Sequence, residues 1–296
     1  MSQGFGCVVL AAMSVFQLAM ASGADVQMPQ RTSLSNIPFV KGPRIVGGQR
    51  AHQGQFPYQV SLRRNGYHAC GGAIISSTMV LTAAHCVAGW RVQSLSIVAG
   101  SVNRHDEVVT RRVRRVFIHD GYLVLSNGTP LHDMAVLALS VPLSLGRNHV
   151  DRVQLAIREM PAGTSCTVSG WGATEESNTW LPDILNYVNV PTISLTDCAR
   201  FFAMNSALIC AGDVEVGGID ACQGDSGGPM VCSGLLIGVV SYGRGCGKPR
   251  SPGVYSSVPY YSSWINAVLS SSNTLLVTPL LPFLPLAMNV ISAAFP

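Results

Sequence analysis

Nine cysteines are the feature of this sequence that most restricts how the chain can fold. So many cysteines are unusual in a reducing compartment, so the count predicts disulfides and an oxidising environment. Cys7 lies in an apolar run over residues 5–20, which ends in the small residues Ala19-Met20-Ala21. This pattern is typical of a secretory signal peptide of residues 1–21, although no Lys or Arg precedes the run. Its removal leaves eight cysteines, the even number that a closed disulfide framework needs.

The composition favours a glycine-rich β protein and excludes other classes. Charged residues make up 11% of the chain, and the formal net charge is +4. A typical soluble domain has about 25% charged residues, so these values exclude a charged disordered chain and argue against a nucleic-acid partner. With 48% hydrophobic residues and 30 glycines, the 296-residue chain can bury a large core connected by many turns.

Short apolar runs separated by glycine and other turn residues fill the region 45–270. Six of these runs are predicted as strands: Gln59–Leu62, Ala73–Ile75, Met79–Leu81, Ser96–Val98, Ala135–Leu139 and Leu235–Val240. Such short strands at close spacing predict an all-β sandwich or barrel. One helix is expected over Tyr260–Leu269, where Trp264, Ile265 and Val268 recur at helical spacing.

The segments 22–44 and 271–296 differ in composition from the region between them. The first is polar, contains proline but no cysteine, and ends in Arg44. The second has no charged side chain, and three internal prolines interrupt its apolar run, which makes it a poor membrane-spanning helix. A lipid-anchor signal and a trimmed or loose tail both remain open. Small residues precede the apolar run, but the polar spacer of an anchor signal is missing.

Three short segments contain the residue types that nucleophilic catalysis needs. His85 follows an apolar run, Asp133 precedes another, and Ser226 lies in the turn Gly224-Asp225-Ser226-Gly227-Gly228-Pro229. A serine hydroxyl is a weak nucleophile until a base accepts its proton, and that base needs a carboxylate to orient it. The glycines allow backbone N–H groups to approach a developing oxyanion. Each segment alone is equally compatible with an ordinary strand end or turn.

Together and in this order, the segments TAAHC, DMAVL and GDSGGP resemble those of the trypsin-like (chymotrypsin-fold) serine proteases. The resemblance covers residues 45–270. It implies two six-stranded antiparallel β-barrels with a C-terminal helix and a site in the cleft between the barrels. It also implies that His85 is the general base, Asp133 its orienting carboxylate and Ser226 the nucleophile. The N–H groups of Gly224 and Ser226 would form the oxyanion hole.

The resemblance further implies a pocket for a cationic side chain. Asp220 lies six residues before the nucleophile, where the family places a carboxylate at the base of its primary pocket. Gly243 and Gly253 match the glycines of the pocket wall, and Ser241 is a further substrate-binding residue. Ala221 offers no hydroxyl beside the carboxylate, so we expect cleavage after Arg and less well after Lys.

Activation by proteolysis follows from the same resemblance. Cleavage after Arg44 would free the ammonium of Ile45, which in the family inserts beside the carboxylate that precedes the nucleophile, here Asp225. The four implied disulfides are Cys70–Cys86, Cys166–Cys232, Cys198–Cys210 and Cys222–Cys246. None of these cysteines lies in the segment 22–44, so no disulfide is expected to tether the released propeptide.

The remaining expectations concern partners and modification. Asn127 begins a glycosylation sequon. The segment 100–116 lacks the paired glutamates of the family's calcium loop, so no metal is expected, and no other cofactor is expected either. Protein substrates, an activating protease and protein inhibitors are the expected partners, outside the cell. A basic segment could form an anion-binding exosite or merely a solvated face: Arg104, Arg111, Arg112, Arg114 and Arg115.

Two other function classes compete with a protease. One is a catalytically inactive relative that acts as a binding protein or cofactor, and the other is a basic binding module on an idle protease fold. The complete set of His85, Asp133 and Ser226, with Asp225 and Ile45, argues against the first of these. Hydrolysis of a small arginine substrate would separate the enzyme from these alternatives.

Overall fold

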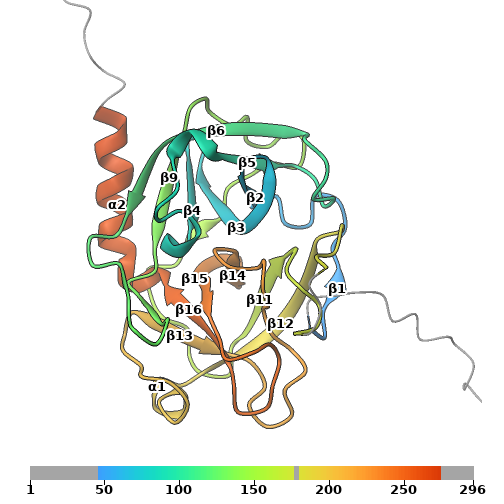
Figure 1. The fold of residues 1–296 in the computed structure, drawn as a ribbon, viewed down its shortest axis with the longest axis vertical. Coiled ribbons are helices and arrows are strands. Elements are labelled where there is room, and N and C mark those ends of the chain that lie inside the picture. The colour runs from blue at the N-terminus through green and yellow to red at the C-terminus, as the bar shows by residue number, and fades with distance from the viewer. Residues whose placement is uncertain (1–45, 177–179, 275–296) are drawn as a thin grey trace, which may run out of the picture. The chain divides into compact units, whose positions relative to one another are not determined.

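The computed structural model describes residues 46–176 and 180–274, with side chains up to residue 271. The predicted signal peptide, the propeptide and the tail from residue 275 lie outside these residues. β-Strands dominate the described chain (Figure 1). They are β1 Gln49–Arg50, β2 Gln59–Arg64, β3 Tyr67–Ser76, β4 Met79–Thr82, β5 Leu95–Ala99, β6 Val109–Ile118, β7 Leu123–Val124, β8 Pro130–Leu131, β9 Ala135–Leu139, β10 Gln154–Leu155, β11 Ser165–Gly170, β12 Asn186–Ile193, β13 Leu208–Ala211, β14 Pro229–Cys232, β15 Leu235–Tyr242 and β16 Gly253–Ser257.

The first barrel is closed and contains six strands in the order β2-β3-β4-β9-β6-β5. All its pairings are antiparallel. Its strands carry apolar residues at inward positions, and Val60, Leu81 and Leu137 are completely buried in its core. The pairing of β2 with β5 closes the barrel, and burial of its apolar side chains stabilises it.

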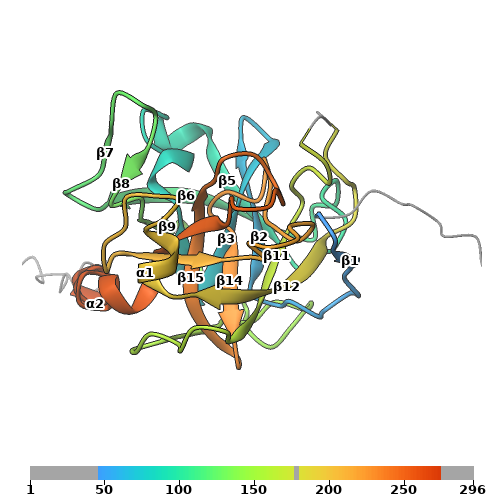
Figure 2. The same ribbon diagram turned by 90° about the horizontal axis from the view of Figure 1, so that it is seen from below.

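The second barrel contains β12-β11-β14-β15-β16-β13 and closes through the pairing of β12 with β13. β1 adds to its edge beside β12, and β10 forms a short parallel pairing with β15. Seen from below, the strands of this barrel lie in front of the first barrel (Figure 2). The prediction of two six-stranded antiparallel barrels is confirmed.

The helical elements are few and short except at the carboxyl end. They are η1 Ala84–Cys86, η2 Val92–Ser94, α1 Leu195–Cys198 and α2 Val258–Thr274. Tyr261, Ile265 and Val268 recur on one face of α2 and are buried. α2 is longer than the predicted Tyr260–Leu269. The Ser257 hydroxyl accepts the Tyr260 N–H at the start, and no glycine or proline stops the helix before Thr274.

Four disulfides join the described cysteines: Cys70–Cys86, Cys166–Cys232, Cys198–Cys210 and Cys222–Cys246. These are the pairs that the family resemblance implies. Each disulfide links two segments of the same barrel or of its loops, so the disulfides stabilise the two barrels separately. Among the described residues, no helix combines the length and the apolar character needed to span a bilayer.

Candidate active site

The carboxylate of Asp133 and the imidazole of His85 meet at the end of two paired strands. β4 and β9 are antiparallel, with Thr82 opposite Ala135. The chain therefore leaves β4 next to the point where it enters β9, which brings the 3-10 turn η1 beside Asp133. Nδ1 of His85 lies 2.7 Å from Oδ2 of Asp133, and the backbone N–H of His85 donates to Oδ1 over 2.8 Å. This contact places the proton of the neutral imidazole on Nδ1 and leaves Nε2 as an acceptor.

Two serines of the second barrel hold Asp133 from the other side. The Ser241 hydroxyl at the end of β15 donates to Oδ2 of Asp133 over 2.6 Å. The Ser256 hydroxyl in β16 donates to the main-chain oxygen of Asp133 over 2.8 Å. Asp133 is only 1% exposed, and a buried carboxylate is stable when charge-assisted hydrogen bonds satisfy its oxygens. Ser241, predicted as a substrate-binding residue, lines the pocket and also fixes the orientation of Asp133.

Ser226 lies in a glycine turn that is pressed against the first barrel. Gly227 has a φ of +76°, and a Cβ there would collide with the Thr82 hydroxyl. Only glycine combines this positive φ with so close an approach. The main-chain oxygen of Ser226 accepts the N–H of Gly71 in β3 over 2.8 Å. The turn from the second barrel is thereby anchored to a strand of the first.

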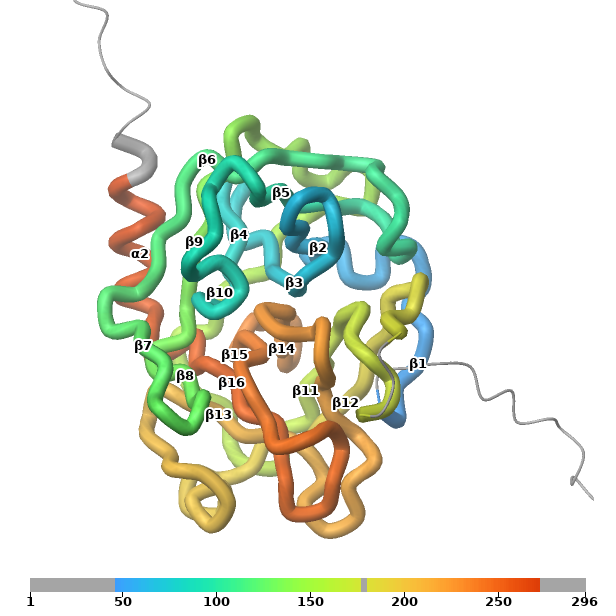
Figure 3. The backbone as a smooth tube through the Cα atoms, in the orientation of Figure 1, coloured from blue at the N-terminus to red at the C-terminus, as the bar shows by residue number. Residues whose placement is uncertain are grey.

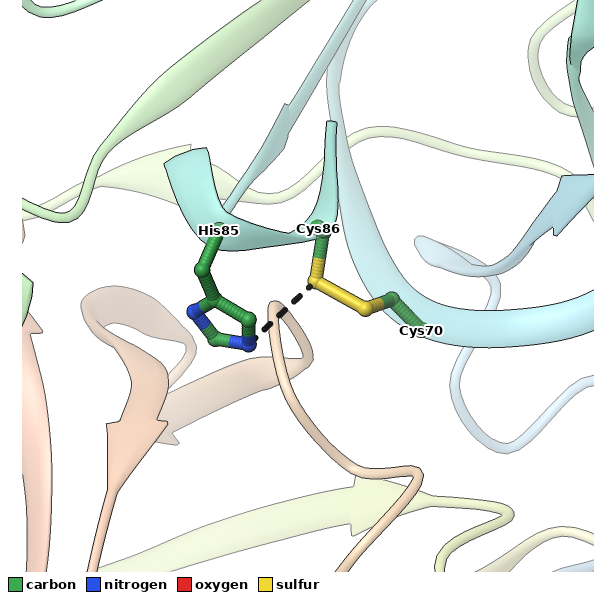
Figure 4. Close-up of side chains that lie close together, drawn as sticks. All are labelled: Cys70, His85 and Cys86. Atoms are coloured by element: carbon green, nitrogen blue, oxygen red, sulfur yellow. Dashed lines mark hydrogen bonds between the residues drawn. A yellow bond between two sulfur atoms is a disulfide. The ribbon is translucent and has the colours of Figure 1, made fainter. Parts of the chain in front are cut away.

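The Nε2 atom of His85 faces the disulfide between Cys70 and Cys86 (Figure 4). It lies 3.7 Å from Sγ of Cys86, and the ligand atoms of these three residues all lie within 4.8 Å of one another. Zinc-type sites require thiolates, whereas both sulfurs here are joined to each other. In the described part of the chain, no hydrogen bond joins Nε2 to the Ser226 hydroxyl. Such bonds are often long before substrate enters a site.

The N–H groups of Gly224 and Ser226 have no acceptor among the described residues. The peptide between them is held from both sides, since the N–H of Asp225 donates to the Cys222 oxygen over 2.9 Å. The ring of His68 supplies the other contact, with Nε2 3.2 Å from the Gly224 oxygen. Two unpaired backbone donors in a fixed loop can stabilise an oxyanion.

His68, half-buried in β3, is a neutral positioning group for this loop. Burial lowers the pKa of His68 to about 4. Its Nδ1 lies 2.8 Å from the Ser61 hydroxyl, which donates to it, so Nε2 carries the proton and donates to Gly224. The ring also packs edge-on against Trp171 at 5.6 Å.

The carboxylate of Asp225 is completely buried beside the glycine turn. Oδ1 accepts the N–H of Gly172 over 2.7 Å, and Oδ2 accepts the N–H of Cys222 over 2.9 Å. Burial raises the pKa of Asp225 to about 7. No cationic side chain of the described residues contacts it. The site can therefore accept a cation from elsewhere in the chain.

A cavity of about 180 Å³ opens next to Ser226. Asp220 lines it and is 2% exposed. Its Oδ2 accepts the N–H of Gly247 over 3.0 Å, while Oδ1 has no partner among the described residues. Burial raises the pKa of Asp220 to about 7. Gly243 and Gly253 also line the cavity, and a Cβ on Gly253 would lie 2.5 Å from Oδ1 of Asp220. The cavity therefore combines a buried carboxyl group with glycines that leave it open.

Residues 45–265 match a family model described as Trypsin. The chain belongs to the trypsin family of serine proteases. It is 40% identical over 234 residues to Trypsin delta of Drosophila erecta, covering 77% of this chain and 89% of that protein. It is 39% identical over 240 residues to Trypsin alpha of Drosophila melanogaster, covering 79% and 91% of the two chains. Trypsin I-P1 of Gallus gallus is 40% identical over 234 residues, covering 77% and 90%. The protein is thus a trypsin-like serine endopeptidase.

Two residues of this trypsin-like site were not predicted from the sequence. Tyr255 lines the cavity, and its buried hydroxyl lacks a partner among the described residues. It lies two residues after Gly253 in β16 and so on the same face, a signal that strand alternation could have supplied. His68 has no comparable signal, because its partner Gly224 is 156 residues away.

The other predicted site residues are placed as follows. Arg44 and Ile45 lie outside the described residues. Asn127 is exposed in the turn of the β7–β8 hairpin, which projects from the first barrel (Figure 2). Its Oδ1 accepts the N–H of Thr129 over 3.0 Å. The sequon is therefore accessible in this trypsin-family protein.

Proposed function

We propose that this trypsin-family protein is a secreted endopeptidase that cleaves after Arg, and less well after Lys, with Ser226, His85 and Asp133 as its catalytic triad. The observation that carries this proposal is the unpartnered Oδ1 of Asp220 in a cavity that Ser226 also lines. A guanidinium can satisfy that oxygen with two parallel hydrogen bonds. A substrate held in this way presents the carbonyl carbon of its Arg to the Ser226 hydroxyl.

The chemistry follows from the hydrogen bonds of the site. Nε2 of His85 accepts the Ser226 proton as the oxygen attacks the carbonyl carbon, and Asp133 stabilises the resulting imidazolium. The N–H groups of Gly224 and Ser226 stabilise the tetrahedral oxyanion. The imidazolium then protonates the leaving amine. Water hydrolyses the acyl-enzyme by the same sequence of proton transfers.

Activation is proposed to couple the amino terminus to Asp225. In the uncut chain, residue 45 has an amide nitrogen and cannot supply a cation. Cleavage after Arg44 by another protease creates an ammonium at Ile45, and the buried Asp225 carboxylate is a suitable partner for it. The ion pair would then order the glycine turn that holds Ser226.

The proposed setting is extracellular. Residues 1–21 act as a signal peptide, 22–44 as the activation propeptide and 45–270 as the protease domain. Protein substrates and protein inhibitors are the expected partners, and Asn127 carries a glycan. The tail 271–296 is a lipid-anchor signal, is trimmed, or is retained as a loose tail.

The decisive experiment compares the protein cut at Arg44 with its Ser226→Ala variant on a small arginine amide. We expect kcat of the variant to be about 10⁶-fold lower. The remaining rate would come from substrate binding and the oxyanion hole. Ser233→Ala, in an exposed turn between β14 and β15, is a matched control that should keep full activity. A Ser226→Ala enzyme with near-normal turnover would exclude the mechanism.

A further inference from the structure

β6 contains a row of four arginines. Arg111 is half-buried, whereas Arg112, Arg114 and Arg115 are exposed. Val113 points into the core and is buried, so regular alternation would turn Arg114 outward and Arg115 inward. The pairing with β9 shifts register between Val113 and Arg115, which marks a β-bulge. Because a bulge adds a residue and re-aims the side chains, Arg114 and Arg115 are both exposed.

No charge of opposite sign lies in the elements that border this strand. β5 and β9, the strands hydrogen-bonded to β6, contain no charged residue. η2 also contacts β6 and is uncharged, and the exposed Arg91 precedes it. Within the described chain, the side chains of Arg112 and Arg114 form no hydrogen bond or ion pair. Arg115 stacks on Phe117 at 4.6 Å. These cations are therefore uncompensated.

Arg104 does not belong to this row, although the sequence grouped it there. Its Nη2 lies 3.1 Å from a carboxylate oxygen of Asp183, and its Nε donates to the Pro182 oxygen over 3.1 Å. Arg111 is also partly engaged, because its Nε donates to the Pro142 oxygen over 3.2 Å. In the described chain, the arginines of this row whose guanidinium groups form no hydrogen bond or ion pair are Arg112, Arg114 and Arg115, here called the β6 arginine face.

The β6 arginine face offers mainly charge. The exposed apolar side chains beside it are Val108, which precedes the strand, and Val141, which follows the Ser140 that is hydrogen-bonded to the Arg112 main chain. None of the ten residues of β6 is a large apolar side chain that is exposed. A folded protein partner would normally need aromatic or aliphatic anchors in the contact. Guanidinium groups bind planar oxyanions through two parallel hydrogen bonds. An extended strand also presents them in a line rather than around a pocket.

We propose that the β6 arginine face binds a linear sulfated polysaccharide. Sulfate and carboxylate groups along such a chain match a line of guanidinium groups, and release of its counterions favours binding. β6 lies on the side of the first barrel away from the second barrel (Figures 1 and 3). A bound polysaccharide would therefore leave the candidate active site open and would hold the protease at a matrix or cell surface.

The test measures binding of the full-length protein to immobilised heparin at several salt concentrations. The variant is R112E/R114E/R115E, and the control is R147E/R152E/R158E, which makes the same charge change at three exposed arginines elsewhere. We expect the β6 variant to bind at least tenfold more weakly at physiological salt than the control. The slope of log Kd against log salt should fall by about two to three, one for each lost contact. Turnover of a small arginine amide should stay unchanged.

Other results would overturn the proposal. An equal loss of heparin affinity in both variants would show that binding depends only on the net charge of the protein. Binding to desulfated heparin as tight as to heparin would remove the role of sulfate. Preference for vesicles of anionic phospholipid or for an acidic peptide over heparin would assign the face to a membrane or a protein instead. Each result is independent of catalysis, so the proposed protease function stands or falls separately.

Discussion

The ring of His68 donates through Nε2 to the carbonyl oxygen of Gly224 over 3.2 Å, although the two residues belong to different barrels. His68 lies in β3 of the first barrel, and Gly224 belongs to the glycine turn of the second. The contact fixes the peptide that separates the two unpaired N–H donors. A side chain outside the cavity lining can therefore determine how well an oxyanion is bound.

His68→Phe should lower kcat by about tenfold or more while changing KM little. The oxyanion forms only in the transition state, and loss of one donor from an oxyanion hole costs about 10²–10³ in kcat. Steady-state kinetics on an arginine amide separates the two constants. His68→Gln, whose amide N–H can still donate to Gly224, should keep most of the activity. A rise in KM at constant kcat would place the effect in substrate binding instead.

The affinity of the pocket for a cation should depend on pH through Asp220. Because burial raises its pKa to about 7, the Asp220 carboxyl group of the empty pocket is mostly protonated at pH 6 and mostly ionised at pH 8. Benzamidinium binds the ionised form, so its Kd should be about tenfold larger at pH 6 than at pH 8. Calorimetry on the Ser226→Ala protein in two buffers would also detect the proton that Asp220 releases.

The control for this prediction is Asp220→Asn, which should bind benzamidinium weakly and without pH dependence. The amide keeps the shape of the carboxylate but loses its charge. A pH-independent Kd in the Ser226→Ala protein would show that Asp220 is already ionised in the empty pocket.

The sequence was sufficient for features that depend on local pattern. All six predicted strands lie within β2, β3, β4, β5, β9 and β15. β6 was not predicted, because its outward arginines and its bulge at Arg114 interrupt the apolar alternation. The bond between Ser241 and Asp133 joins residues 108 apart and depends on how the barrels pack. Contacts of this kind cannot be deduced from spacing along the chain.

The uncut protein should lose stability as pH rises from about 5 to 8. Burial raises the folded-state pKa of Asp225 from 3.8 to about 7, so in this range the folded state binds more protons than the unfolded state. The free energy of unfolding then falls with rising pH, by roughly 3 kcal/mol between pH 5 and pH 8 for this group. Thermal unfolding of Arg44→Gln, which cannot be cut at that position, measures the effect.

Asp220 contributes with the same sign, because burial also raises its pKa to about 7. To distinguish the contributions of the two carboxyl groups, Asp225→Asn or Asp220→Asn is added to Arg44→Gln. Each substitution should remove part of the dependence of the unfolding free energy on pH. After cleavage of the wild-type protein, the Ile45 ammonium should offset the cost of the Asp225 charge and flatten the profile. An identical slope in the cut and uncut proteins would contradict the proposed ion pair.

Selectivity between Arg and Lys should depend on the residue next to Asp220. Arg reaches the carboxylate with a planar, two-pronged hydrogen bond, whereas the shorter Lys is a point charge that needs additional oxygen acceptors nearby. Ala221 lines the cavity and has no hydroxyl to offer. We therefore expect kcat/KM for matched peptides to favour Arg by about tenfold, or ~1.4 kcal/mol.

Ala221→Ser should narrow the ratio of kcat/KM for Arg to kcat/KM for Lys, by raising kcat/KM for Lys while leaving that for Arg nearly unchanged. Ala173→Ser, a buried alanine outside the cavity lining, is the control that should not alter the ratio. Equal rates for Arg and Lys in the wild-type enzyme would refute the role of Ala221, and a preference for Phe would refute the assignment of Asp220.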